Sequence, residues 1–139
     1  MDIKEYLREV RDLKRDMVAK QEERAYLHSL VSNPGSMHPK EIQVQTSLPM
    51  DKLGDIVSDV ADIDAVIVGE IASYTKMIGK AHEIVNSASN PTYRAILTQY
   101  YLLGYNWDKV ADENGYSPTH IRKLHGWALK ELYEKYDTK

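Results

Sequence analysis

Hydrophobic residues recur every three or four positions along most of the chain, which is the spacing of one buried face of an α-helix. The first run predicts a single helix over about residues 2–31, because it contains neither glycine nor proline. Charged residues of both signs fill its other positions, as on a helix face in contact with water. The apolar positions of this run are Ile3, Tyr6, Val10, Leu13, Met17, Leu27 and Val31.

The second run, over about residues 50–88, has the most regular spacing in the chain. Ten positions alternate in steps of four and three, and nine of them are apolar or aromatic, which predicts a coiled-coil-like helix. These positions are Leu53, Val57, Val60, Asp64, Ile67, Ile71, Tyr74, Ile78, Ala81 and Val85. Asp64 breaks the pattern, so we expect it either to set the register or to lie opposite Lys14, Lys20 or Arg24.

The two predicted helices are expected to pair as a long antiparallel hairpin over residues 1–88. A loop over 32–49 connects them, since it opens with the turn residues SNPGSMHP and continues through Val44–Ser47 as an ordered loop. The apolar surface of the second helix is wider than one partner helix covers. We therefore expect this surface either to pack on the C-terminal domain or to form a homo-oligomer through the long helices.

Residues 89–139 predict a second domain of three helices, which makes the whole fold all-α. Asn90 can cap the first of these helices, and Pro91 suits the first helical position because its missing N–H has no partner there. This helix is expected to run to about Leu103, where Gly104 ends it.

The other two helices of this domain predict a helix-turn-helix. Asn106 can cap the first of them, and Gly115 stands where the chain must turn with a positive φ. Ser117 is a good N-cap for the last helix, which begins at Pro118. In such a motif the second helix enters the DNA major groove with its N-terminal turns.

Charge along the chain supports this interpretation locally. The net charge is −3, which argues against a general nucleic-acid coat. From Ser117 to Lys130, however, there are three Lys or Arg residues, two His residues and no acid. Because local charge sets the field at a docking helix, we expect modest and strongly salt-dependent affinity for double-stranded DNA.

Particular side chains of the motif are candidate DNA contacts. Arg122 and Lys123, in the second turn of the last helix, are suited to base edges or phosphates. Thr119 and His120 lie in the first turn, where side chains and backbone N–H groups can meet phosphate. The full predicted set is Asn106, Lys109, Ser117, Thr119, His120, Arg122 and Lys123.

Two further residues of this helix have predicted environments. His125 either faces DNA or packs under the helix. Trp127 lies one position off the apolar stripe, and we expect it to pack against a long helix at the edge of the domain, the alternative being an interface with a partner.

The C-terminal segment resembles region 4 of bacterial sigma-70 factors. The matching sequence is NWDKVADENGYSPTHIRKLHGWALKEL, preceded by a helix that ends in QYYLLGY. It resembles still more closely the ArpU-like and RinA-like late transcription regulators of Gram-positive phages, which place this domain behind a helical N-terminal region. The resemblance implies a regulator of phage transcription in the cytoplasm of a bacterial host, acting with host RNA polymerase.

The chain departs from sigma factors in two ways. It has no counterpart of region 2, and neutral Pro118 and Thr119 stand where sigma factors carry charges. Two alternatives therefore stay open. One is a protein like the small terminase subunit of phages, which would form a large ring on packaging-site DNA. The other is a helical adaptor that binds protein and no DNA.

Other classes find no support in the sequence. There are no cysteines and no apolar run of about 18 residues, so we expect neither a disulfide scaffold, nor a thiolate metal site, nor a membrane span. The N-terminus is charged and unlike a signal peptide. His120 and His125 lie five apart, off the spacing of a helical zinc site. Without a catalytic motif, we expect no enzyme, no metal and no cofactor.

Overall fold

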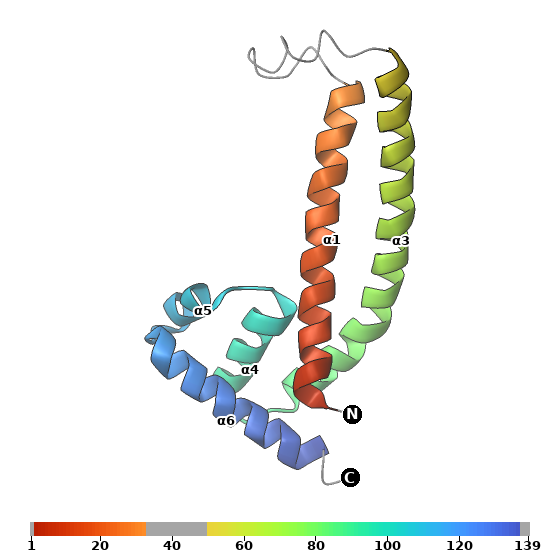
Figure 1. Cartoon of the computed structure of the whole chain (residues 1–139). Helices are drawn as coiled ribbons and strands as arrows, with labels where there is room; N and C mark the ends of the chain where they lie inside the picture. Colours follow the sequence, from red (N-terminus) through yellow and green to blue (C-terminus); the bar gives the residue numbers. More distant parts are fainter. Residues whose placement is uncertain (1, 33–49, 137–139) are drawn as a thin grey trace. The chain divides into compact units, whose positions relative to one another are not determined.

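The computed structural model describes residues 2–32 and 50–136, and in these ranges the only regular structure is helical. The helices are α1 (Ile3–Ser32), α3 (Met50–Asn86), α4 (Pro91–Leu97), the π-helical segment η2 (Thr98–Leu102), α5 (Trp107–Asn114) and α6 (Pro118–Tyr136) (Figure 1). The predicted all-α class is therefore confirmed. The predicted loop, including Val44–Ser47, lies outside the described residues apart from its first position, which belongs to α1.

The chain forms two compact units. Unit 1 comprises Met1–Arg15 and Ser73–Lys139, and unit 2 comprises Asp16–Ala72. The unit that holds the C-terminal helices is thus larger than the predicted domain over 89–139. The reason is a shared core, because apolar residues near the start of α1 are fully buried together with residues of α4 and α6.

In unit 2, α1 and α3 run antiparallel and are joined by ion pairs. Lys20 Nζ lies 2.9 Å from a carboxylate oxygen of Glu70, and Arg24 Nε lies 2.5 Å from one of Asp64. Asp64 therefore lies opposite Arg24, one of its predicted partners. Both side chains of that pair are more than 40% exposed, so the pair contributes at most about 1 kcal/mol to stability.

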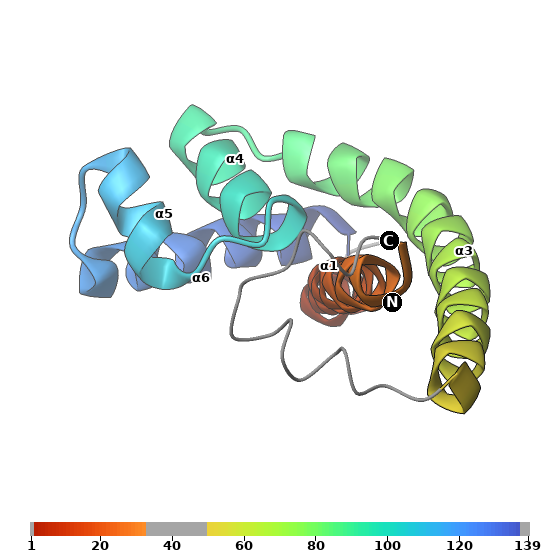
Figure 2. The ribbon, with the colours of Figure 1, turned by 90° about the horizontal axis from the view of Figure 1, so that it is seen from above.

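In unit 1, the start of α1 and the end of α3 pack against the C-terminal helices. Ile3, Leu7 and Val10 of α1 are 0% exposed, and they share one cluster with Val85 of α3 and Leu132 of α6. The Tyr6 hydroxyl donates to the Met77 carbonyl at 3.0 Å, which ties α1 to α3. Helix α4 lies beside α6 in the same unit (Figure 2).

The helix that begins at Pro91 has a wider final turn than predicted. It opens as expected, since the Asn90 side chain accepts from the Thr92 N–H at 2.8 Å. Its last five residues form η2, in which the Leu103 N–H donates to the Thr98 carbonyl. Gly104 follows with a φ of 78° and ends the helix as predicted.

Basic side chains of α1 cap the end of η2. Arg11 Nε donates to the Tyr100 carbonyl at 3.0 Å, and Lys14 Nζ donates to the Leu102 carbonyl at 2.9 Å. A helix end leaves such carbonyls without partners inside the helix, so these cations satisfy groups that otherwise need water. The position of η2 is thereby fixed on α1.

Candidate functional site

The connection between α5 and α6 is built from the predicted capping residues. The Asn106 side chain accepts from the Lys109 N–H at 2.8 Å and caps α5. Ser117 Oγ accepts from the His120 N–H at 3.2 Å at the start of α6, and Pro118 is the first residue of that helix. Both polar caps satisfy backbone donors of a first turn.

Gly115 makes the sharp turn between the two helices. Its φ of 72° and ψ of 29° are left-handed, as predicted. The Gly115 N–H donates to the Asp112 carbonyl, and the Tyr116 N–H donates to the Ala111 carbonyl at 3.0 Å. This pair of bonds is the Schellman arrangement, and it sets the direction in which α6 leaves the turn.

A small apolar cluster holds α5 and α6 together. It consists of the buried residues Ile96, Val110, Ala111 and Ile121, from α4, α5 and α6. Tyr100, Trp107 and Leu124 pack against it. Since the cluster fixes α6 on its inner side, the opposite side of α6 is left to solvent.

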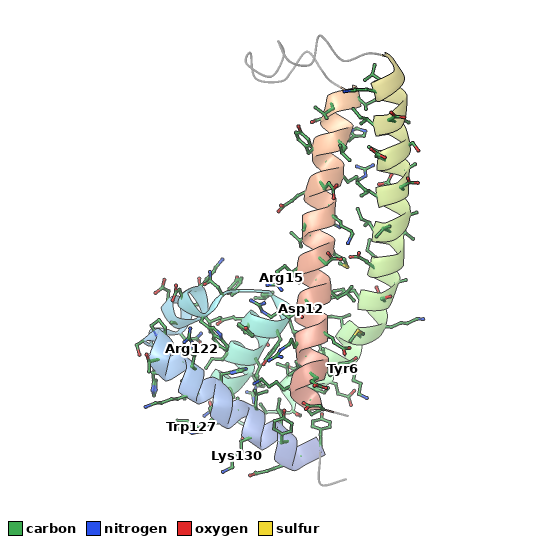
Figure 3. All side chains as sticks on the ribbon, viewed as in Figure 1. Tyr6, Asp12, Arg15, Arg122, Trp127 and Lys130 are labelled. Carbon is green, nitrogen blue, oxygen red and sulfur yellow. The ribbon has the colours of Figure 1, made fainter. Side chains whose placement is uncertain are left out.

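The outer face of α6 is exposed and carries positive charge. Thr119, Lys123, Trp127 and Lys130 are exposed at helical spacings, and Figure 3 shows Trp127 and Lys130 on the side of α6 away from α4. Trp127 is 52% exposed and belongs to neither apolar cluster, so the prediction that it packs on a long helix is wrong. It lies one position beyond the buried arc, where none of the described helices of unit 1 covers it.

The predicted contact residues fall into different roles. Asn106 and Ser117 are exposed, but their side chains already serve as caps. Lys109 Nζ lies 4.0 Å from the centre of the Tyr105 ring, a cation–π contact. His120 is exposed, with its ring centre 5.0 Å from that of Tyr116.

Arg122 and Lys123 lie on different sides of α6. Lys123 belongs to the outer face, whereas Arg122 borders a cavity on the inner side, where Figure 3 also places it. The cavity has a volume of about 390 Å³. Besides Arg122, its lining residues are Lys4, Arg8, Arg11, Asp12, Tyr100, Tyr101, Trp107 and His125.

Aromatic side chains form one wall of this cavity. Tyr100 and Trp107 stack, with ring centres 3.9 Å apart and planes inclined by 12°. The His125 ring meets Trp107 edge-on at 4.6 Å, and His125 Nε2 is hydrogen-bonded to the Tyr101 hydroxyl at 2.7 Å. Of the two predicted environments of His125, the packed one is therefore correct.

Burial determines the charge state of this wall. Burial, with a smaller contribution from the charge of Lys4, lowers the pKa of His125 from 6.5 to about 4. Burial also raises the pKa of Tyr101 well above its usual range. At neutral pH both side chains are therefore uncharged, and the charge of the cavity comes from the Lys and Arg residues around it.

Sequence reasoning missed the contribution of α1 to this region. Lys4, Arg8 and Arg11 are spaced four and three apart, so they share one helix face, and this signal was present in the sequence. What the sequence did not reveal is that this face lies beside α6. Lys130, on the outer face of α6, was likewise not among the predicted contacts.

Within residues 2–32 and 50–136, no three potential metal ligands lie close enough together to hold a metal ion. None of the described helices is both long and apolar enough to cross a membrane. Comparison with family models, curated proteins and solved structures found no match for the chain.

Proposed function

We propose that this protein is a DNA-binding transcription regulator whose α4–α6 region is a trihelical helix-turn-helix carried by a long helical hairpin of α1 and α3. The observation that carries the proposal is the turn at Gly115. A capped α5, a left-handed glycine and a capped α6 whose first turns are exposed form the arrangement that such motifs place in the major groove.

The charge of α6 supports the same function. No acidic residue occurs between Ser117 and Lys130, although the chain as a whole carries a net charge of −3. Lys123 and Lys130 lie on the exposed face, and Thr119 and His120 lie at the exposed N-terminal turn. In the proposed complex these side chains contact phosphates and base edges, Arg122 reaches the groove from the flank, and Asn106 and Lys109 lie beside the backbone.

The likeness to ArpU-like and RinA-like regulators adds the biological setting to the proposal. In the proposed setting the protein acts in a bacterial cell that carries a phage or prophage, and host RNA polymerase is its proposed partner. Because Arg122 points inward, we propose that Lys123 is the main DNA contact of the outer face and that Arg122 contacts DNA at the edge of that face.

We propose self-association through α3 as part of this function. Val57, Ala61, Ala65, Val68 and Ala72 are all exposed, and they follow one another at steps of four, four, three and four residues. Such spacing places them on one stripe of the helix, here named the α3 stripe. A second copy is the proposed occupant, because two copies of one stripe are complementary to each other and a dimer doubles the DNA contacts.

Selection from a random pool of DNA duplexes, at about 100 mM salt, tests the regulator function. We expect one enriched motif, single or paired. The double variant Arg122→Ala and Lys123→Ala should lose on the order of 10- to 100-fold in affinity for that motif. The matched control is Lys52→Ala with Lys76→Ala, since both lysines are exposed on α3.

Weak binding without an enriched motif would overturn the regulator function. The adaptor that binds protein would then be favoured, and Trp127 is the observation in its support, because half-exposed tryptophan is typical of protein interfaces. A ring of high mass bound to one packaging sequence would instead indicate a protein like the small terminase subunit.

A further inference from the structure

The cavity between α1 and α6 in unit 1 has an excess of positive charge. Lys4, Arg8, Arg11 and Arg122 line it, against Asp12 as its one acidic lining residue in the described part of the chain. The Asp12 carboxylate is already paired, 3.2 Å from an Arg15 nitrogen. The charge of the cavity therefore favours an anion.

Three of these cations are available to a ligand. Across the described ranges, the side chains of Lys4, Arg8 and Arg122 form no ion pair and no hydrogen bond with another residue. All three are exposed, so they reach the cavity from its rim. Although the net charge of the chain is −3, these three residues form a local group of positive charges outside the described ion pairs.

Arg11 is held in place at the base of this group. Its Nε donates to the Tyr100 carbonyl at 3.0 Å, and one terminal nitrogen donates to the Tyr105 carbonyl at 3.4 Å. Its guanidinium carbon lies 4.2 Å from the centre of the Tyr100 ring. A guanidinium fixed in this way loses little conformational entropy when it meets an anion.

The aromatic wall adds a second kind of recognition. Tyr100, Trp107 and His125 line the same cavity that the cations surround. Trp107 and the Arg11 guanidinium cover the two faces of Tyr100, so a ligand ring would meet Trp107 and His125. At about 390 Å³, the volume falls within the range of roughly 300–1,000 Å³ that is typical of small-molecule sites. Rings beside clustered cations suit a ligand that is both planar and negatively charged.

We propose that this cavity binds a phosphorylated small molecule with a planar ring, of the nucleoside mono- or diphosphate class. The phosphate groups lie among Lys4, Arg8 and Arg122, and the ring lies against the aromatic wall. A phosphate of the DNA backbone would meet the same cations, but it would leave the aromatic wall unused.

A regulatory effect of the ligand, unlike its binding, rests on the proposed regulator function. Arg122 belongs both to the cavity and to the proposed recognition helix, so a bound ligand changes the charge that α6 offers to DNA. By linkage, DNA and the ligand then alter each other's affinity by the same factor.

A fluorescence titration without DNA tests the binding itself. The chain has two tryptophans, so the variant Trp127→Phe leaves Trp107 as the only one, and Trp107 lines the cavity. We expect ADP to change its emission in a saturable way, inorganic pyrophosphate to bind more weakly, and adenosine at the same ionic strength to have no effect. Calorimetry with ADP provides a readout that does not depend on emission.

Variants of the rim locate the ligand. Lys4→Gln with Arg8→Gln should weaken ADP binding at least 10-fold, while Lys76→Gln with Lys80→Gln, on exposed lysines of α3, should leave it unchanged. Helix content by circular dichroism checks that each variant folds.

The proposal is overturned if neither emission nor calorimetry detects ADP, or if the rim variant binds ADP as tightly as the parent. It is also overturned if only duplex DNA responds to the rim substitutions, because the cations then belong to the DNA interface. Since the titration contains no DNA, failure of the regulator function leaves its result intact.

Discussion

At the scale of single residues, Gly115 determines how α5 passes into α6. Its φ of 72° is costly for any residue with a Cβ atom, although a Cβ there would meet no atom within 4 Å. Gly115→Ala should therefore destabilise the fold by about 1 kcal/mol through backbone strain alone. Thermal unfolding followed by circular dichroism measures the change.

Gly126 is the matched control for that substitution. A Cβ atom at this position would also meet open space, but Gly126 lies inside α6 with ordinary helical backbone. Gly126→Ala should raise stability by up to about 1 kcal/mol, because alanine favours the helix. If Gly115→Ala and Gly126→Ala changed stability in the same direction, backbone strain at Gly115 would not be the cause.

His125 makes the stability of the fold depend on pH. Its pKa is about 4 in the folded protein, below the ordinary value of 6.5, so the unfolded chain binds the proton more readily. The stabilisation due to neutral His125 should therefore be fully present above pH 6.5 and be lost as the pH falls through 4, at a total cost of about 3 kcal/mol. Denaturant unfolding at several pH values across this window gives the slope.

Variants of the two histidines of α6 show whether His125 causes the change of stability with pH. His125→Gln should flatten the slope, since the titrating group is removed. His120→Gln is the control, since it leaves His125 in place, and it should keep the slope. An unchanged slope in His125→Gln would show that other groups cause the pH dependence.

At the scale of elements, the exposed face of α3 offers a test of self-association. Val57 and Val68 are 52% and 66% exposed and belong to the α3 stripe. Replacing both with lysine should reduce the sedimentation mass from that of an oligomer to that of a monomer, because burying two charges against a partner copy is costly.

Val66 provides the control, since it is 46% exposed but lies off the α3 stripe. Val66→Lys should leave the oligomer intact. A parent protein that sediments as a monomer at all accessible concentrations would rule out the dimer. Equal effects of both kinds of substitution would rule out the stripe as its interface.

The elements were also the part of the structure most accessible from sequence. Helix positions followed from apolar spacing, and the ends of α4, α5 and α6 followed from Asn90, Asn106, Gly115 and Pro118, because each acts through its own backbone. The π-helical turn of η2 was not predicted. Its end is held by Arg11 and Lys14, far away in sequence, whose side chains donate to carbonyls at the end of the helix.

At the scale of the whole molecule, the sequence indicated one ion pair between the long helices but not which helices pack on the start of α1. The match of Asp64 with Arg24 was among the predicted possibilities, since opposite charges at a helix seam attract. The burial of Ile3, Leu7 and Val10 with the C-terminal helices was not predicted, because an apolar stripe fits any apolar neighbour. The cavity was missed for the same reason, because three of its four cations, Lys4, Arg8 and Arg11, come from α1.

The mixed core of unit 1 bears on how the protein folds during synthesis. Ile3 and Leu7 share a cluster with Leu129 and Leu132, and the Tyr133 hydroxyl donates to Asp2 at 2.9 Å, 131 positions away. A ribosome makes the α1 side of this core long before the α6 side. Ile3 and Leu7 therefore lack their α6 contacts while the intervening helices are synthesised. The core of unit 1 can form only after α6 has left the exit tunnel.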